Sequence, residues 1–429
     1  MRVAMYTLGC KVNQYETQAM EQELRRRGHW LVAFEDEADA YVVNTCSVTA
    51  VSDKKSRQML RRAKTAHPGA VVAACGCYSQ THADEAERLG LDIVAGSAER
   101  ESFITLLEQT VRERKHIRMI DDPLRRRSFE ILPAGSVPGR TRAILKIEDG
   151  CTNFCSYCII PFSRGPIRSL PPDEGVRQLR ALAAEGYRET VITGIEIAGY
   201  GRDLDGHIGL ADFLDAAAEA VPGMRLRLGS LEPRIITEDF CRRLSRHENL
   251  CPHFHLSLQS GADATLRRMN RRYTTAEYMH AVELLRQYFP RVAITTDLIT
   301  GFPGETEEEF SETLAFIRKA GFADMHIFPY SVRPGTAAAK LPRQLPRAVK
   351  EERAHRAAAV AEEMHRAFLE STVGTVVRVL FEQKKEDGRF YGHAPDYTEV
   401  SVAGDGLHNE IRDVRLLSVS GDTMRGELI

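Results

Sequence analysis

Short apolar runs alternate with amphipathic stretches along the first 125 residues of the chain. The apolar runs predict strands, and the stretches in which apolar residues recur every three or four positions predict helices. Strands that alternate with helices are typical of βαβ units and a parallel sheet covered on both faces. We therefore predict a doubly wound α/β domain over residues 1–125, with strands at 2–8, 40–44, 70–74 and 91–95 and helices at 16–27, 53–65, 83–89 and 101–113.

A stretch rich in Pro, Gly and Arg at residues 121–141 indicates a linker, and the alternation resumes after it. Six βα repeats over about 230 residues are the pattern of a partial or full (β/α) barrel. We assign residues 138–370 to this second domain, including a helix at 346–369. Its predicted strands are 144–148, 190–193, 225–230, 253–258, 292–297 and 323–328, and its other helices are 174–185, 211–220, 238–246, 276–287 and 307–319.

The last residues of the chain, 372–429, change to short strands separated by Gly. This pattern predicts a small all-β barrel. The predicted fold class is therefore α/β: a doubly wound N-terminal sheet, a central (β/α) barrel and a small C-terminal barrel.

The composition is that of an ordinary folded protein, with 43% hydrophobic and 28% charged residues. A net charge of −2 and a pI near 6.7 argue against a globally basic nucleic-acid binder, so any RNA must be met by local patches. We expect no membrane span, because no apolar run approaches about 18 residues, and no secretory signal. Nine cysteines, an odd number, indicate metal-bound thiolates in a reducing cytoplasm.

Three of these cysteines, Cys151, Cys155 and Cys158, form a C-x3-C-x2-C loop directly after a predicted strand. One such loop can reach three corners of a [4Fe–4S] cube and leave one iron open for chemistry. Structural zinc is the alternative, but it requires four ligands, and no nearby Cys or His supplies the fourth. The loop also falls at the C-terminal face of the barrel, where the active sites of such barrels lie.

A second trio, Cys10, Cys46 and Cys77, follows three different predicted strands of the first sheet. Ligands of doubly wound sheets bind outside the carboxyl ends of the strands, so we expect these thiols to converge on one site. The alternative is three buried, purely structural cysteines. Cys75 is a possible substitute for Cys77, although it should point back into the sheet. Cys241 and Cys251 are interpreted as packing residues.

The cysteine loop resembles that of the radical S-adenosylmethionine (SAM) superfamily, in which an aromatic residue, here Tyr157, precedes the last Cys. The resemblance implies that the open iron binds SAM and that cleavage of SAM yields a 5′-deoxyadenosyl radical. Further motifs at strand ends are similar to SAM contacts, although each alone is also ordinary turn chemistry. The resemblance thus implies SAM-binding roles for Gly194, Glu196, Ser230, Glu232, Asp297, Gly301 and Glu305.

The order of a three-Cys α/β domain, a radical SAM barrel and a small β-barrel resembles the methylthiotransferase family over the whole chain. The resemblance implies a second [4Fe–4S] cluster on Cys10, Cys46 and Cys77 that carries the transferred sulfur. It also implies two SAM molecules per turnover and an OB-like TRAM barrel that binds RNA. All six cluster cysteines would then be catalytic as well as metal ligands.

Residues 10–16, 158–165 and 255–261 resemble the branch of this family that acts on N6-threonylcarbamoyladenosine (t6A). We therefore expect methylthiolation of carbon 2 of t6A at position 37, in the anticodon loop of tRNA. The alternatives are the same chemistry on N6-isopentenyladenosine or on an aspartate of ribosomal protein S12. An iron–sulfur protein that only binds RNA or carries electrons is a non-enzymatic alternative, disfavoured by the SAM motifs.

Local basic runs are the candidate RNA contacts, although a run of this kind is more often a solvated face. The C-terminal 58 residues are unexpectedly acidic for an RNA-binding barrel, with ten Asp and Glu against seven Lys and Arg. We also expect a monomer and a separate reductant protein as a partner. The predicted RNA-binding residues are Arg267, Arg268, Arg271, Arg272, Lys384 and Lys385.

Overall fold

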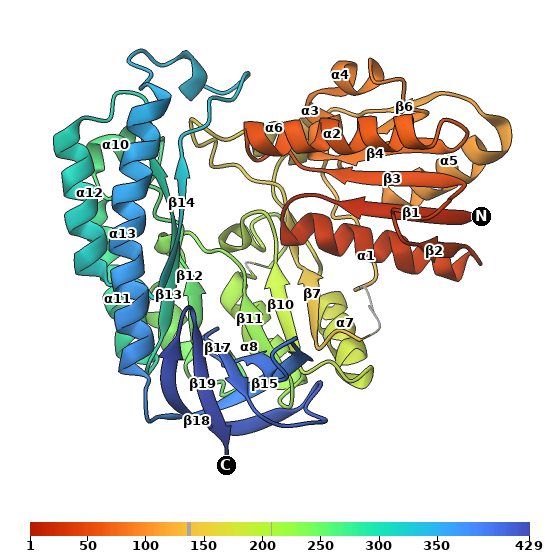
Figure 1. Ribbon diagram of the computed structural model, residues 1–429. Helices are drawn as coiled ribbons and strands as arrows, with labels where there is room; N and C mark the ends of the chain where they lie inside the picture. The colour runs from red at the N-terminus through yellow and green to blue at the C-terminus, as the bar shows by residue number, and fades with distance from the viewer. Residues whose placement is uncertain (135–138, 207) are drawn as a thin grey trace.

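The structure is a computed structural model that describes residues 1–134, 139–206 and 208–429. It consists of three units that meet around a common centre (Figure 1). Residues 135–138, which include part of the predicted linker and the predicted start of the second domain, lie outside the described residues. The domain boundaries drawn from the sequence stay predictions. None of the helices in the described residues combines the length and apolar character needed to cross a bilayer.

The N-terminal unit is a six-stranded parallel sheet in the order β2-β1-β3-β4-β5-β6. Helices α1 and α5 cover one face and α2, α3 and α4 the other, because successive strand residues alternate between two apolar clusters. The sheet is thus doubly wound, as predicted. The strands are Arg2–Thr7 (β1), Trp30–Val32 (β2), Ala40–Thr45 (β3), Val71–Gly76 (β4), Ile93–Ala95 (β5) and Ile117–Met119 (β6); the helices are Lys11–Arg26 (α1), Ala50–Ala66 (α2), Cys77–Thr81 (α3), Ala83–Glu87 (α4) and Arg100–Glu113 (α5).

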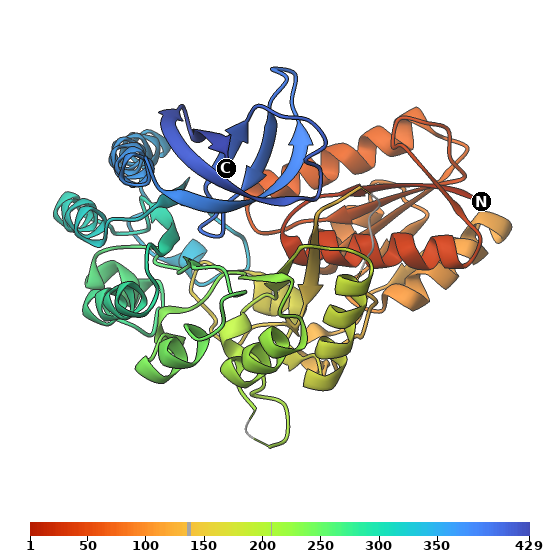
Figure 2. The same cartoon turned by 90° about the horizontal axis from the view of Figure 1, so that it is seen from below.

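Six parallel strands, β7 and β10 to β14, form the central unit as two three-stranded sheets. Single parallel bridges such as Leu231 to Leu256 join β11 to β12, which gives a partial (β/α) barrel. The helices form an arc around the strands when seen from below (Figure 2). The strands are Arg142–Lys146 (β7), Glu189–Thr193 (β10), Arg225–Leu228 (β11), His253–His255 (β12), Ala293–Thr300 (β13) and Asp324–Pro329 (β14), with a short hairpin of Glu148–Asp149 (β8) and Arg168–Ser169 (β9).

Six helices of the central unit, α7 to α9 and α11 to α13, begin and end within a few residues of the predicted ranges, whereas the short helices α6 and α10 were not predicted. A capping box begins α12: Thr306 Oγ1 accepts a hydrogen bond from the Glu309 amide, and the Glu309 carboxylate accepts one from the Thr306 amide. The helices are Ile160–Arg164 (α6), Pro172–Ala184 (α7), Leu210–Ala220 (α8), Glu238–Leu244 (α9), Asp263–Arg268 (α10), Thr275–Tyr288 (α11), Glu307–Ala320 (α12) and Arg347–Ser371 (α13).

The C-terminal unit is a closed five-stranded barrel with the order β15-β16-β17-β19-β18, as predicted. It lies against the N-terminal ends of the central strands (Figure 1). Arg225 and Arg227 of β11 donate hydrogen bonds to main-chain carbonyls of the barrel, and Arg142 of β7 pairs with Glu382 at 3.1 Å. The strands are Val376–Lys384 (β15), Phe390–His393 (β16), Glu399–Val402 (β17), Ile411–Ser420 (β18) and Thr423–Leu428 (β19).

Candidate functional site

The loop from Cys151 to Cys158 follows β8 at the C-terminal face of the barrel, as the sequence predicts. Backbone amides point at two of its sulfurs: the Asn153 amide lies 3.5 Å from Cys151 Sγ, and the Ile160 amide 3.4 Å from Cys158 Sγ. Burial raises the pKa of Cys158 to about 12, so the bare thiol is protonated at neutral pH. A positively charged metal centre is what would stabilise the thiolate at this position.

Arg271, predicted from the sequence to bind RNA, contacts this cysteine loop. Its guanidinium donates to Cys155 Sγ at 3.3 Å and to the Ser257 carbonyl at 3.2 Å. It also lies over the Tyr273 ring, 4.8 Å from the ring centroid. The cation is therefore placed to stabilise a thiolate at Cys155, a role that the basic run in the sequence conceals.

The trio Cys10, Cys46 and Cys77 comes together at the ends of β1, β3 and β4, which are neighbours in the sheet. The other two thiols are close enough to affect the ionisation of Cys46. Burial raises the pKa of Cys46 to about 11, and the charges of Cys77 and Cys10 raise it further. The trio thus occupies one small region at the carboxyl edge of the sheet. Whether it holds a cluster stays a prediction.

Glycine permits this convergence at the first strand end. Gly9 has a φ of +105°, and a Cβ added to it would lie 2.8 Å from Cys46 Cβ and 2.9 Å from Cys46 Sγ. No side chain fits there without moving Cys46. Cys75, in contrast, is a residue of β4 and packs in the apolar cluster between the sheet and helices α1 and α5, whereas Cys77 lies beyond the strand end, at the start of α3.

In the described part of the chain, no three His, Cys, Asp or Glu side chains stand close enough to share one metal ion. Thiolates on an iron–sulfur cube each bind a different iron, so they stand further apart than the ligands of a single ion. The donor sets present, three thiolates in each group with a guanidinium on one of them, fit such a cube. They contain no fourth ligand for a structural zinc ion.

Arg164 joins the two cysteine groups. It lies six residues after Cys158, at the end of α6, and its Nε donates to Cys77 Sγ at 3.3 Å. Its Nη2 donates to Asn13 Oδ1 at 2.7 Å, and its Nη1 contacts the Glu16 carboxylate. One fully buried side chain of the central unit thereby contacts two elements of the N-terminal sheet domain.

A buried ion-pair network surrounds Arg164. Four cations share two carboxylates, so the network carries a net positive charge. The positive charges of Arg164, Arg100 and Lys146 hold the pKa of Glu16 well below its usual range despite its burial. Such an excess suits an anionic group nearby, as a thiolate-bound cluster would be. The members are Glu16, Arg100, Lys146, Asp149, Arg164 and Arg168.

Glu196 is the predicted SAM-binding residue with the clearest capacity for a ligand. Its amide donates to Glu148 Oε2 at 2.6 Å and its Oε2 accepts from Asn153 at 3.1 Å, while its buried Oε1 has no partner. Burial raises its pKa to about 7, and the negative charge of Glu232 adds to this. Gly194 is required beside it, since a Cβ there would lie 2.7 Å from Glu148 Oε2.

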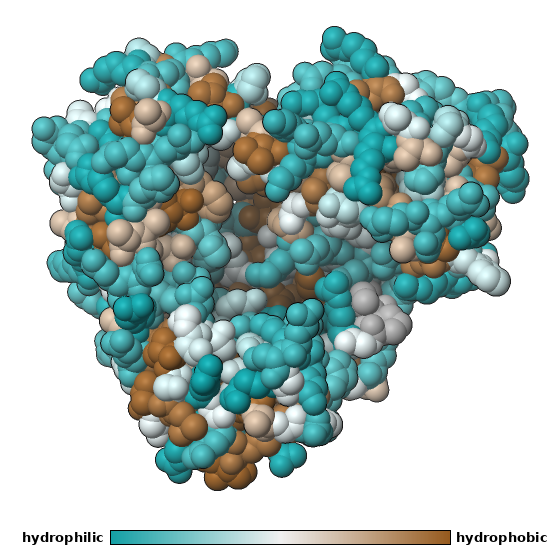
Figure 3. Space-filling model, in the orientation of Figure 1, coloured by the Kyte–Doolittle hydropathy of each residue, from teal (hydrophilic) through white to brown (hydrophobic). Residues whose placement is uncertain are grey.

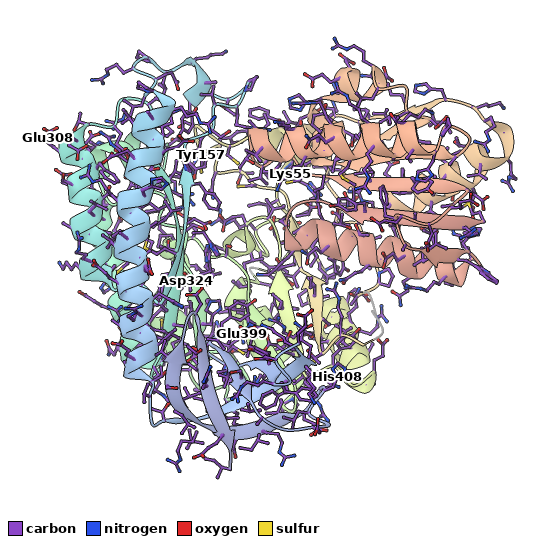
Figure 4. All side chains as sticks on the ribbon, viewed as in Figure 1. Lys55, Tyr157, Glu308, Asp324, Glu399 and His408 are labelled. Carbon is purple, nitrogen blue, oxygen red and sulfur yellow. The ribbon has the colours of Figure 1, made fainter. Side chains whose placement is uncertain are left out.

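The remaining predicted SAM residues fall into two groups. Tyr157 packs edge-on against Phe302 at the upper part of the central unit (Figure 4), and Ser230 and Asp297 line the barrel interior. Glu232 is paired with Arg234 at 2.7 Å. By contrast, the buried turn from Gly301 to Glu305 is tied to α13: Glu305 accepts from the Gly301 amide and pairs with Arg353, both within 2.8 Å. Their roles toward SAM stay predictions.

The predicted RNA contacts differ in whether each cation already has an ion-pair partner. Arg267 and Arg272 are exposed, and in the described residues no carboxylate lies within ion-pair distance of either. Arg268 pairs with Glu309. Lys384 and Lys385 form exposed pairs with Asp405 and Glu399, at 2.6 and 2.8 Å.

Comparisons with known proteins identify the family. Residues 145–317 match the model of the radical SAM superfamily, and residues 2–96 match the uncharacterized protein family UPF0004. The chain is 38% identical, over all of its length and 96% of the relative, to threonylcarbamoyladenosine tRNA methylthiotransferase MtaB of Bacillus subtilis (strain 168). The chain belongs to the radical SAM methylthiotransferase family. It is therefore an enzyme, and the family implies SAM and a [4Fe–4S] cluster as cofactors.

Two further similarities place the methylthiotransferase among its relatives. It is 32% identical, over 99% of its length and 91% of the relative, to tRNA-2-methylthio-N(6)-dimethylallyladenosine synthase of Caldicellulosiruptor saccharolyticus. Its fold is similar to that of the radical SAM methyltransferase TsrM from Kitasatospora setae, with a TM-score of 0.58 over 76% of the chain and 72% of TsrM. At 15% identity, this second likeness shows the fold alone.

We predict that Gly9→Ala lowers the iron content of the anaerobically reconstituted enzyme, because the added methyl group displaces Cys46. Gly28→Ala is the matched control: Gly28 also has a positive φ, of +81°, but nothing lies within 4 Å of the position that its methyl group would take. Both variants incur about 1 kcal/mol of backbone strain. Equal iron content in the two variants would contradict the close approach at Gly9.

Proposed function

We propose that this enzyme methylthiolates carbon 2 of t6A at position 37 of tRNA. The observation that carries the proposal is the 38% identity, over the full chain, to a relative named for threonylcarbamoyladenosine. Three further relatives with that name share 34–36% identity. Relatives named for dimethylallyladenosine, which is the N6-isopentenyladenosine considered above, share 32–34% identity. That nucleoside is therefore the second candidate substrate.

The reaction explains why two cysteine groups lie in one enzyme. A carbon–hydrogen bond that no side-chain base can ionise requires a radical, and the sulfur that replaces the hydrogen must be held nearby. A [4Fe–4S] cluster bound by Cys151, Cys155 and Cys158 supplies, with SAM, the radical chemistry. We place the sulfur-carrying second cluster on Cys10, Cys46 and Cys77.

Protein side chains hold and orient the reacting groups in this proposal. Glu196 accepts a hydrogen bond from the amino group of SAM through its unpartnered, buried oxygen. Arg271 and Arg164 each donate to one cluster thiolate, Cys155 and Cys77 respectively, and so fix its orientation. The buried network around Glu16 keeps the two cysteine groups at a constant separation, because it joins the units that carry them.

The tRNA is met by exposed cations of the central unit and by the C-terminal barrel. Arg267 of α10 and Arg272, just after it, are exposed cations without an ion pair among the described residues. The ion pairs of Lys384 and Lys385 are exposed and therefore weak, so a phosphate can replace their carboxylate partners. The barrel is assigned as a TRAM module on this basis. A monomer and a separate reductant protein stay part of the proposal.

Deletion of the gene should remove the 2-methylthio form of t6A from total tRNA and leave t6A itself in place. Mass spectrometry of tRNA nucleosides measures both, before and after complementation with the wild type or with Cys151→Ala, of which only the wild type should restore the product. Loss of the 2-methylthio form of isopentenyladenosine instead would establish the second candidate. Peptide mass spectrometry of ribosomal protein S12 tests the remaining alternative.

The two-cluster assignment predicts independent iron losses. Cys77→Ala and Cys151→Ala should each lose about four irons of about eight in the reconstituted enzyme, because each removes a ligand of one cube. Cys75→Ala is the control, since Cys75 packs in an apolar cluster and should retain all the iron. A wild type with only about four irons would refute the second cluster.

The position of Glu196 predicts that SAM binding depends on pH. With its pKa raised to about 7, the carboxyl is mostly protonated at pH 6 and mostly ionised at pH 8. Only the ionised carboxylate accepts a charge-assisted hydrogen bond from the amino group of SAM, so SAM affinity should rise about tenfold between these pH values. Isothermal titration of the reconstituted enzyme measures this change. The Glu196→Gln variant should bind SAM weakly, with the same affinity at pH 6 and pH 8. If its SAM affinity instead rises with pH as in the wild type, the contact is refuted.

A further inference from the structure

A cavity of about 570 Å³ lies where the three units meet, visible as a hollow in the surface (Figure 3). The strands of the central unit form its wall, and Tyr397 of the C-terminal unit contributes to its floor. Lys11 and Gln14, three residues apart on one face of α1, line it from the N-terminal unit. It also contains Ser230 and Asp297, so it is continuous with the predicted SAM side of the site.

Most charges in this cavity are already paired. Arg227 is bound to Glu189 at 2.7 Å, Arg142 to Glu382 at 3.1 Å, and Asp297 to His255 at 3.3 Å. The two arginine–glutamate pairs carry no net charge, and the Asp297 carboxylate is partnered by the His255 ring.

Two cations of the cavity lining are different. Lys11 and Arg140 are exposed to the cavity solvent, and in the described residues neither has a carboxylate within 4.0 Å. They approach it from α1 and from the segment just before β7. Asp324, on β14, is the acidic residue of the lining without an ion pair among the described residues, and its Oδ1 accepts the Met325 amide. The side of the cavity nearest α1 is therefore positive.

The floor of the cavity suits a planar group with polar edges. His253 is 8% exposed, stacks on Tyr397 at 5.1 Å, and has an Nδ1 atom with no hydrogen-bond partner. Burial lowers the pKa of His253 well below its usual value, so the ring is neutral. The neutral His253 ring and Tyr397 thus give this part of the cavity an uncharged, aromatic surface.

Lys11 also has a defined position relative to the proposed sulfur. It directly follows Cys10 and is the first residue of α1, so its chain enters the cavity beside the second cysteine group. A substrate with its reacting carbon near that group would place its substituent within reach of the cavity cations.

We propose that Lys11 and Arg140 bind the carboxylate of the N6-threonylcarbamoyl group and so select an anionic substituent over an apolar one. The inference rests on the proposed function and deepens it. A carboxylate would pair with both cations by charge-assisted hydrogen bonds. An isopentenyl group would instead displace water from them and offer no partner, which disfavours that substrate.

The test compares three anticodon stem-loop RNAs that differ in the N6 group: threonylcarbamoyl, its uncharged threonine-amide analogue, and isopentenyl. The wild type should prefer the carboxylate over the amide about 10-fold to 100-fold in kcat/KM and in binding measured by fluorescence anisotropy. In the double variant Lys11→Met/Arg140→Met this ratio should fall to about one. Each single variant should lie between.

Lys55→Met is the matched control, because Lys55 is an exposed lysine of α2 in the same unit that does not line the cavity (Figure 4). It should keep the wild-type ratio. Iron content verifies that each variant is loaded, and Lys11→Gln with Arg140→Gln provides a second, polar pair should the methionine pair lose iron.

The outcomes separate the two proposals. A double variant that keeps the full preference for the carboxylate overturns the assignment of Lys11 and Arg140, while activity on the t6A RNA still supports the proposed function. A wild type that modifies the isopentenyl RNA but not the t6A RNA overturns both. A preference lost in the double variant but kept in Lys55→Met supports the inference.

Discussion

The guanidinium of Arg164 joins the two units that carry the enzyme's two cysteine groups. It belongs to the central unit, yet it donates to Cys77 and to Asn13 of the N-terminal unit and contacts Glu16 there. All of these contacts are buried, so solvent does not screen them. Removal of one partner from a buried ion pair typically costs about 3–5 kcal/mol, because the other charge is left without compensation. The relative position of the two units is therefore tightly set.

The same network has a cost that its location explains. Buried cations in excess of carboxylates are unfavourable in an empty protein, since desolvation disfavours every charge. The excess lies near Cys10, a thiol whose pKa burial raises and the positive charge of Arg164 lowers. Anionic clusters would offset the positive charge, and the positive charge would stabilise thiolates. The charges of the protein and of the clusters thus balance one another. We therefore expect the contact between the N-terminal and central units to be less stable when the clusters are not bound.

Local patterns make the fold and the cysteine groups predictable from the sequence. Apolar runs mark the strands, and each thiol of the second trio comes just after one: Cys10 and Cys77 follow Gly9 and Gly76, and Cys46 follows the last residue of β3. The short edge strands β2 and β6 escape prediction because three residues carry too little periodicity. Helix α1 begins at Lys11, earlier than predicted, because the polar residues Asn13 and Glu16 are buried in contacts that no local pattern shows.

Long-range pairing explains what the sequence could not show about the site. A basic run around residue 271 is the usual sign of a solvated or phosphate-binding face, yet Arg271 turns inward to Cys155. Arg164 is visible in the sequence only as part of a motif, because its partners Cys77 and Asn13 lie 87 and 151 residues away in the chain. A buried salt bridge joins residues that are polar in sequence and core-like in structure. Hydrophobic periodicity cannot detect them.

One acidic residue of the C-terminal barrel has a structural role where the barrel meets the central unit. Its Glu382 neutralises Arg142, and its main-chain carbonyls accept hydrogen bonds from Arg225 and Arg227, so the barrel supplies negative groups to arginines of the central strands. Tyr397, with a φ of +74°, extends from it toward the cavity floor and lies under Arg227. A strained conformation at a non-glycine residue persists where surrounding contacts fix it. The barrel therefore closes the base of the cavity by electrostatic complementarity to the protein, and its net charge need not match that of RNA.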